Sequence, residues 1–425
     1  MIEDSPRRPL MTSSSLQPGF ACSVDASRPE PSRSSAIYRH AGEPIGDIEQ
    51  AYSGRLTPDL AVNTFRNIDR LFPTRIISAG ASPRPLGQAP TSLDGVIASA
   101  NGDAYDLYDY LALNSVTGLL VLRHGEIVHE TYQRGNRRDT RWMSMSVAKS
   151  ICSTLAGMAI RDGLIPEGLS SQVTDYVPAL AGSAYEGVSL RDLLMMASGV
   201  AWNETYTDPR SDRRALLKAQ IAQQPGRAIK VMAALPRAVR PGTLHNYSTG
   251  ETQILAELVR RAVGRPLADY LSEKLWQPYG MESDACWWLE SADGVEIGGS
   301  GIAATLRDYA RFGQFMLDGG RLDGQPLLPE GWVDEATRPT TLVGSQSPLE
   351  YGYMWWTAWT EPSRRDRAFA ARGIHGQLIY VNPARDIVIA QNAAAPKPLG
   401  RLVIDPMVFC DAVVAHLEGQ AGGPA

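Results

Sequence analysis

Lysine and cysteine are scarce in this chain of 425 residues. Five lysines and 36 arginines make up its 41 basic residues, so arginine carries nearly all of the positive charge. The four cysteines, Cys22, Cys152, Cys286 and Cys410, are scattered and form no C-x-x-C pair. This spacing argues against a disulfide scaffold and a cysteine-rich zinc site, and it favours reduced thiols in a cytoplasmic protein.

Signals for metals, nucleic acids and membranes are also missing. The six histidines form no H-E-x-x-H pair, so we expect no metal and no other cofactor. A net charge of -5 without a basic stripe argues against nucleic acid as a partner. No apolar run approaches the length of a membrane span, and residues 1–40 lack the apolar block of a secretory signal. We therefore expect a cytoplasmic protein that binds neither nucleic acid nor a membrane, and whether it forms a homodimer is left open.

The overall composition of the chain is that of a globular protein. Hydrophobic residues make up 44% of the chain and charged residues 20%, which is enough to build a sizeable core. We expect residues 1–90 to form a Pro- and Ser-rich arm that is partly irregular and ordered only over 68–77. The remainder predicts an α/β fold, in which a sheet domain (91–165 and 290–425) is interrupted by a helical domain (166–289).

Sequence periodicity places strands at both ends of this sheet domain. Alternating residues around an Arg-His-Gly turn predict a hairpin over 118–133, and three further strands are predicted over 351–359, 376–382 and 386–393. Apolar residues at helical spacing predict a long helix over 146–164. We therefore expect one sheet flanked by helices.

The long apolar helix starts in the stretch "RWMSMSVAKSIC", which holds two serines close to a lysine. Only Ser146 has a lysine three positions later, at Lys149, and residues i and i+3 of a helix share a face. Apolar surroundings lower the pKa of a lysine, and the neutral amine can then accept the proton of the serine hydroxyl. Partial positive charge at the helix start favours an oxyanion. The stretch therefore fits a nucleophile, Ser146, with its base, Lys149.

Spacing alone does not separate this pair from a lysine that reaches solvent at the surface of a helix. With 33 serines and five lysines, about 0.4 chance matches of this spacing are expected per chain. Two features favour catalysis. The neighbours Met145, Val147 and Ile151 leave little polar surface for a charge. In addition, lysine can lose its proton, whereas the arginine used nearly everywhere else in this chain cannot.

Five segments in a fixed order extend the pattern: "SMSVAKS", "VSLRDLLMMASGVAW", "PGTLHNYSTGETQILAELVRRAVGRPLADYL", "GGSGIAATLRDYARFGQFMLDGG" and "GIHGQLIYVNP". Together they resemble the serine β-lactamase-like superfamily, which includes penicillin-binding proteins, class C β-lactamases and family VIII carboxylesterases. Within it, "MSVAKS", "WNETYTDP", "WW" and "GIHGQ" are most similar to the 6-aminohexanoate-dimer hydrolase (nylon-oligomer hydrolase) group. The resemblance runs from about residue 55 to the end. It implies a β-lactamase/transpeptidase-like fold, an antiparallel sheet flanked by helices with a helical insertion domain.

The resemblance also implies the roles of individual residues. Ser146 would be the acylated nucleophile and Lys149 its proton acceptor. Tyr247, in "NYST", matches the tyrosine of the Y-x-N motif, which shares the base function and protonates the leaving group. The third position of this motif is Thr249 here rather than Asn. The backbone N–H groups of Ser146 and Ile374 would form the oxyanion hole.

Three further residues are candidates for substrate binding. Tyr206 and Trp356 match substrate-contact positions of the nylon-oligomer hydrolases, and ordinary packing of these rings in the core is an equal alternative. His375 is expected to line the pocket or to end a strand. A Ser-His-Asp triad is not expected, because no G-x-S-x-G elbow surrounds any serine of the chain.

The resemblance implies a serine hydrolase, an amidase or carboxylesterase that cleaves small linear amides or esters through an acyl-enzyme. Two alternatives stay open: a β-lactamase or D-Ala-D-Ala peptidase, and a non-catalytic binding protein on the same fold. The K-T-G motif of the first alternative is "ARG" here, with Ala371 at the lysine position, although Arg372 could partly replace that charge. The presence of Ser146, Lys149 and Tyr247 together argues against a binding protein.

Overall fold

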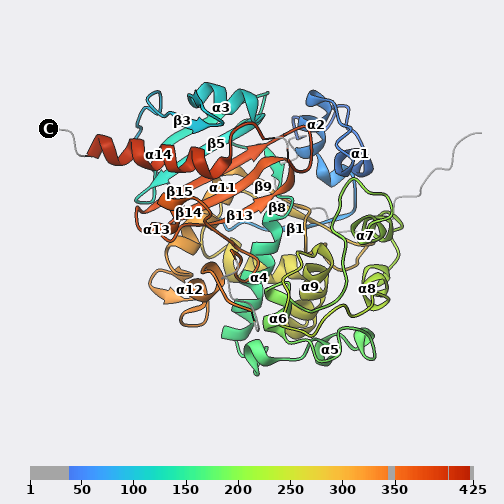
Figure 1. The fold of residues 1–425 in the computed structure, drawn as a ribbon. Helices are drawn as coiled ribbons and strands as arrows, with labels where there is room; N and C mark the ends of the chain where they lie inside the picture. The colour runs from blue at the N-terminus through green and yellow to red at the C-terminus, as the bar shows by residue number, and fades with distance from the viewer. Residues whose placement is uncertain (1–37, 343–349, 401, 422–425) are drawn as a thin grey trace, which may run out of the picture. The chain divides into compact units, whose positions relative to one another are not determined.

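The largest sheet has seven strands in the order β12–β13–β14–β15–β5–β6–β2 (Figure 1). Neighbouring strands are antiparallel except β2 and β6, which run parallel. The strands are β2 (Gly87–Gln88), β5 (Val116–Arg123), β6 (Glu126–Tyr132), β12 (Trp356–Thr357), β13 (Phe369–Gly373), β14 (Gln377–Asn382) and β15 (Ile387–Ala393). The structure is a computed structural model that describes residues 38–342, 350–400 and 402–421. All seven strands lie in the compact unit that begins at His40.

Helices cover both faces of this sheet, which explains why β14 and β15 are buried along their whole length. One face carries α3 (Leu107–Leu113) and α14 (Pro406–Ala421), and the other carries α4 (Val147–Arg161) and α11 (Leu306–Leu317). Successive strand residues point to opposite faces, so Ile389 packs with the α3 and α14 side chains and Val388 with those of α4 and α11. The layers confirm the predicted α/β fold with a mainly antiparallel sheet flanked by helices.

A second sheet has four antiparallel strands in the order β1–β8–β9–β7. Its strand β7 directly precedes α4 in the chain. Its strands are β1 (Thr74–Ile77), β7 (Arg141–Met143), β8 (Ala285–Trp288) and β9 (Ile302–Thr305). β8 lies inside the segment that the sequence predicts to be helical. All four of its residues are buried, so it lacks the alternation of apolar and polar residues by which a strand is recognised.

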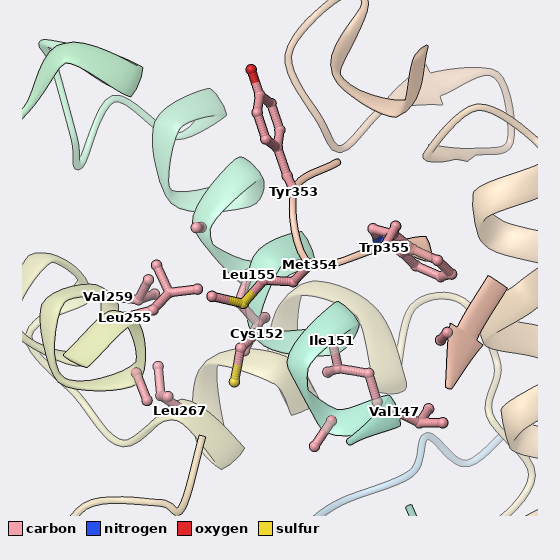
Figure 2. Packing of buried hydrophobic residues seen from close by; sticks show 14 of the residues in the cluster. Val147, Ile151, Cys152, Leu155, Leu255, Val259, Leu267, Tyr353, Met354 and Trp355 are labelled. Atoms are coloured by element: carbon pink, nitrogen blue, oxygen red, sulfur yellow. The ribbon is translucent and has the colours of Figure 1, made fainter. Parts of the chain in front are cut away.

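Between β7 and β8 the chain is mainly helical. The helices after α4 are α5 (Val173–Tyr176), α6 (Leu190–Leu194), α7 (Asp212–Ile221), α8 (Arg227–Ala233), α9 (Thr249–Val263) and α10 (Leu267–Leu271). Figure 2 shows the apolar side chains of α4, among them Ile151, Cys152 and Leu155, together with Leu255 and Val259 of α9. Burial of each such leucine stabilises the fold by about 1.5–3 kcal/mol. The limits expected for separate sheet and helical domains stay a prediction.

Residues 48–65 are more ordered than the sequence predicts. We expected order only over 68–77, whereas the structure has helices α1 (Ile48–Tyr52) and α2 (Pro58–Phe65). A capping box at Asp47 starts α1, and Pro58 occupies the first turn of α2, where it favours a helix instead of breaking one. Buried Tyr52 and Phe65 anchor both helices in an apolar cluster. Residues 1–37 of the predicted arm lie outside the described residues.

Three of the four cysteines lie in the described residues, and Cys22 lies outside them. Cys152, Cys286 and Cys410 are buried free thiols. Within the described ranges, no helix is long and apolar enough to cross a bilayer. The same part of the chain holds no cluster of His, Cys, Asp and Glu side chains that could bind a metal ion.

Candidate active site

Ser146 lies in the turn that joins β7 to α4. Met145, just before it, has a φ of 45°, a left-handed conformation that costs a non-glycine residue roughly 1–2 kcal/mol. Ser144 holds this turn, since its hydroxyl accepts the Ile302 N–H at 3.2 Å and donates to the Met145 carbonyl at 3.1 Å. The two serines therefore differ in their contacts: Ser144 ties the turn to β9, and Ser146 starts α4 with no capping hydrogen bond from its side chain.

Lys149 lies one turn further along α4 and reaches back to Ser146. Its Nζ donates to Ser146 Oγ at 2.8 Å and to the Gly299 carbonyl at 3.0 Å. Only 1% of Lys149 and 9% of Ser146 are exposed. Burial is the largest influence on this lysine and lowers its pKa to about 7, helped by the positive charge of Arg213 and opposed by the negative charge of Glu204. A large share of Lys149 is therefore neutral at pH 7.

Tyr247 lies beside this pair, directly before the N-cap residue of α9, Ser248. The Lys149 Nζ is 5.2 Å from the centre of the Tyr247 ring. Burial raises the pKa of Tyr247, with a further rise from Glu204, so the phenol carries its proton at neutral pH. The structure thus places Tyr247 beside Ser146 and Lys149, although it lies far from them in the sequence.

The end of β13 approaches the same turn. An added Cβ on Gly373 would lie 2.7 Å from the Ser144 carbonyl oxygen and 2.9 Å from Met145 Cβ, so only glycine permits this approach. Ile374 follows directly and is buried. Neither the Ile374 nor the Ser146 amide donates a hydrogen bond to another residue in the described ranges.

Aromatic side chains surround Tyr247. Trp356 stacks on it with ring centres 5.6 Å apart, and Tyr351 stands edge-on to Trp356 at 4.9 Å. Tyr206 is buried and stacks at 5.8 Å on Tyr52, which comes from α1. Trp356 therefore borders Tyr247 directly, whereas Tyr206 belongs to a neighbouring stack.

His375 has a different setting from Ser146, Lys149 and Tyr247, with which it shares no hydrogen bond. Its Nδ1 lies 2.7 Å from the Ala395 carbonyl, and its backbone N–H donates to the Pro398 carbonyl. Burial lowers the pKa of the imidazole to about 4, so the ring is neutral and donates through Nδ1. These contacts hold the loop 394–398 against the end of β13.

Glu204 is a residue of the site that sequence reasoning did not single out. Its carboxylate accepts the Thr249 N–H at 2.9 Å and also the Thr249 hydroxyl. Arg213 Nε lies 4.0 Å away. The segment "WNETYTDP" contains Glu204 and one of its partners, Trp202, but Arg213 and Thr249 lie in α7 and α9, and nothing in the local sequence indicates them.

A large cavity in the described ranges does not hold these residues. It has a volume of about 1450 Å³ and lies around α12 (Trp332–Thr337), with Met316, Leu328 and Phe369 among its lining residues. The candidate active site is therefore defined by the contacts of Ser146, Lys149 and Tyr247 and not by this cavity.

Fold and sequence together define the class of this protein. The family model described as Beta-lactamase matches residues 115–406, and the chain belongs to the beta-lactamase family. It is a hydrolase of the serine β-lactamase-like kind, as the sequence resemblance predicts.

Individual relatives narrow the comparison. The chain is 30% identical over 347 residues to the 6-aminohexanoate-dimer hydrolase of Paenarthrobacter ureafaciens, a match that covers 79% of this chain and 85% of the relative. A solved structure from Bacillus anthracis, assigned as a 6-aminohexanoate-dimer hydrolase, has a TM-score of 0.76 at 22% identity and covers 87% of this chain and 97% of its own. A family VIII carboxylesterase has a TM-score of 0.55 at 18% identity, with coverage of 71% and 91%. The two structures show the fold.

Proposed function

We propose that this protein is a serine hydrolase that cleaves small linear amides or carboxylic esters through an acyl-Ser146 intermediate. The observation that carries the proposal is the 2.8 Å contact between Lys149 Nζ and Ser146 Oγ, in surroundings that lower the lysine pKa to about 7. A neutral amine at this distance is a general base within reach of the proton it must accept.

In the acylation step, Ser146 Oγ attacks the substrate carbonyl while its proton passes to Lys149. The amides of Ser146 and Ile374 would donate to the resulting oxyanion, a role that their lack of other hydrogen bonds supports. Tyr247 gives its proton to the leaving amine or alcohol and is reprotonated by Lys149. The bond from carbon to the leaving group breaks, and an acyl-serine remains.

In the deacylation step, a water molecule attacks the acyl-serine and loses its proton to the same groups. Collapse of the second tetrahedral intermediate releases the carboxylic acid and returns the proton to Ser146. One set of residues therefore serves both halves of the reaction, in opposite directions.

The substrate class rests on the relatives and on the aromatic residues. Similarity to the 6-aminohexanoate-dimer hydrolase of Paenarthrobacter ureafaciens supports linear amides. Trp356, which stacks on Tyr247, offers an apolar surface to an aliphatic chain, and Tyr206 and His375 are further candidates for the substrate-binding wall. We also propose a cytoplasmic location, which the buried free thiols support.

The nucleophile and base are tested with p-nitrophenyl butyrate and 6-aminohexanoate dimer as substrates. Ser146→Ala and Lys149→Arg should each lower kcat by roughly 10²–10⁴-fold, since an arginine keeps the charge but cannot act as a base. Ser170→Ala and Lys230→Arg, at exposed positions, serve as matched controls with unchanged turnover. Full activity of Ser146→Ala would reject the nucleophile, and most of the turnover retained in Lys149→Arg would reject the neutral base.

A β-lactamase or D-Ala-D-Ala peptidase is the second candidate. Arg372 supports it, because its guanidinium lies 5.6 Å from the ring centre of Trp356 and could meet a substrate carboxylate. Ala371, at the lysine position of the K-T-G motif, is fully buried and argues against it. Rapid hydrolysis of nitrocefin in the same assays would favour this candidate. Turnover of none of the three substrates would favour a non-catalytic binding protein.

A further inference from the structure

The Glu204 carboxylate connects the loop after α6 to the start of α9. Its side chain is only 16% exposed. One oxygen accepts the Thr249 N–H and the Trp202 indole N–H, and the other accepts the Thr249 hydroxyl. Hydrogen bonds to an ionised carboxylate are shorter and stronger than bonds between neutral groups. Glu204 therefore holds the first residue of α9, two positions after Tyr247.

Thr249 passes this constraint on to Lys149. An added Cβ on Gly299 would lie 2.6 Å from Thr249 Cγ2, so the threonine methyl group packs closely on the Gly299 backbone. The Gly299 carbonyl in turn accepts the hydrogen bond from Lys149. Direct contacts therefore connect Glu204 to Thr249, Thr249 to Gly299, and Gly299 to the candidate base, Lys149.

Glu204 also has a buried cationic neighbour. Arg213, on α7, is 2% exposed, and its guanidinium carbon lies 4.3 Å from the ring centre of Tyr52. The pair places one negative and one positive charge beside the candidate site. Glu204 raises the pKa of Lys149 and of Tyr247, and Arg213 lowers both.

Few other ionisable groups lie close to Lys149 or to the pair formed by Glu204 and Arg213. The thiol of Cys152, on α4, raises the Lys149 pKa further. The phenols of Tyr206 and Tyr351 lie within electrostatic range of Glu204, whose charge raises the pKa of each. Glu204 is therefore the carboxylate that acts on the candidate base.

We propose that Glu204 is a positioning residue of the site, which works with Arg213 and holds Thr249 so that Tyr247 and Lys149 converge on Ser146. This inference rests on the proposed function for its catalytic meaning. It also accounts for the threonine in the third position of the Y-x-N motif. The Thr249 hydroxyl donates a hydrogen bond to Glu204, so it is not available to bind a substrate.

The scarcity of lysine makes a direct test possible. Protein labelled with ¹³C at lysine Cε has only five lysines to resolve by NMR, and Lys149→Arg identifies the Lys149 signal. In the unaltered chain we expect this signal to titrate near pH 7. In Glu204→Gln the midpoint should fall by roughly half a unit or more, because a negative charge that favours the ammonium form is lost.

Kinetics with p-nitrophenyl butyrate supply the second readout. A glutamine at position 204 brings two N–H donors towards the donors of Thr249, so kcat should fall at least about ten-fold with a smaller change in KM. The acid limb of the pH–rate profile should move to lower pH together with the NMR midpoint. Glu204→Asp keeps the charge, so its fall in kcat and its shift of the Lys149 midpoint should both be smaller than those of Glu204→Gln.

Thr249→Val tests the position of Thr249 without changing the charge of Glu204. It also provides a test if Glu204→Gln does not fold. Valine keeps a methyl group against Gly299 and removes the hydroxyl. We expect kcat to fall several-fold while the Lys149 midpoint stays unchanged. Glu330→Gln, at an exposed position outside the site, is the matched control for loss of a carboxylate.

Two results would overturn the inference: an unchanged or higher Lys149 midpoint in folded Glu204→Gln, or full kcat in Thr249→Val. A chain that never hydrolyses the ester in a Ser146-dependent manner would instead reject the proposed function. The NMR titration does not need turnover, so the two failures are distinguishable.

Discussion

At the scale of single residues, the environment of Lys149 decides what the site can do. Its amine is buried and meets only uncharged acceptors, the Ser146 hydroxyl and the Gly299 carbonyl. A lysine without a carboxylate partner loses its proton easily in such surroundings. Arginine at this position would stay charged at any pH that the fold tolerates.

The pH dependence of hydrolysis follows from this environment. In the proposed mechanism the neutral amine is the active form. Because the lysine pKa is lowered to about 7, kcat/KM should then fall as pH drops below about 7 and level off above it. The measurement is a profile of kcat/KM between pH 5 and pH 9 on a neutral ester, whose own charge does not change. A flat profile would contradict the neutral base.

Residue-level reasoning from the sequence succeeded where the interaction is local. Ser146 and Lys149 lie three positions apart, and the helical repeat alone places them together. Glu204 and Thr249 lie in different elements, and only the fold brings them into contact. His375 is adjacent to Ile374, yet its hydrogen bonds to Ala395 and Pro398 depend on a loop whose course the sequence does not reveal.

At the scale of elements, the end of β13 and the turn between β7 and α4 form one unit. Gly373 allows the two backbones to approach, and Ser144 ties the turn to β9. The strands of both sheets therefore meet at the start of α4. Such a meeting point explains how a serine at a helix start is held in place although Met145 has a left-handed backbone.

A single methyl group tests this unit. Gly373→Ala would place a Cβ about 0.5 Å or more inside normal contact distance of the Ser144 carbonyl, so β13 should move away from the turn. The Ile374 amide would move with it, and we expect kcat to fall at least about ten-fold with little change in KM. Gly42→Ala, where an added Cβ meets no atom within 4 Å, is the control. Equal kcat in the two variants would show that the close approach is unimportant.

The sequence predicts β5, β6, β14, β15 and α4 because their patterns are strong and continuous, whereas it did not predict β13 and made β12 too long. It missed α1 and α2 because the Pro- and Ser-rich composition of residues 1–90 suggested an irregular arm, although Pro58 at the first turn of α2 favours a helix. It missed β8 because all four residues of the strand are buried. In both cases the burial that decides the element comes from distant parts of the chain.

At the scale of the whole molecule, the N-terminal helices join segments that are distant in sequence. Tyr52 of α1 stacks on Tyr206 and faces Arg213. Phe65 of α2 lies 5.0 Å from the His375 ring, and Gly54 accepts a hydrogen bond from Lys397. The segment that the sequence suggested to be an arm thus contacts both the helical block and the loop after β15.

A truncation tests the importance of this segment. A chain that begins at Asn67 lacks α1 and α2, exposes the partners of Tyr52 and Phe65, and should lose most of its hydrolytic activity and several degrees of Tm. The full chain of 425 residues retains both helices and is the control. Activity measurements and thermal unfolding on the two chains check the prediction, and equal behaviour would contradict it.

The few lysines of this chain have a practical consequence for attaching it to a solid support. Lys218 on α7, Lys230 on α8 and Lys397 in the loop after β15 are exposed, whereas Lys149 is 1% exposed. Amine-coupling reagents would therefore react at these exposed side chains and spare the buried amine at the start of α4. An enzyme immobilised in this way would be held in a small number of orientations, with its candidate base chemically intact.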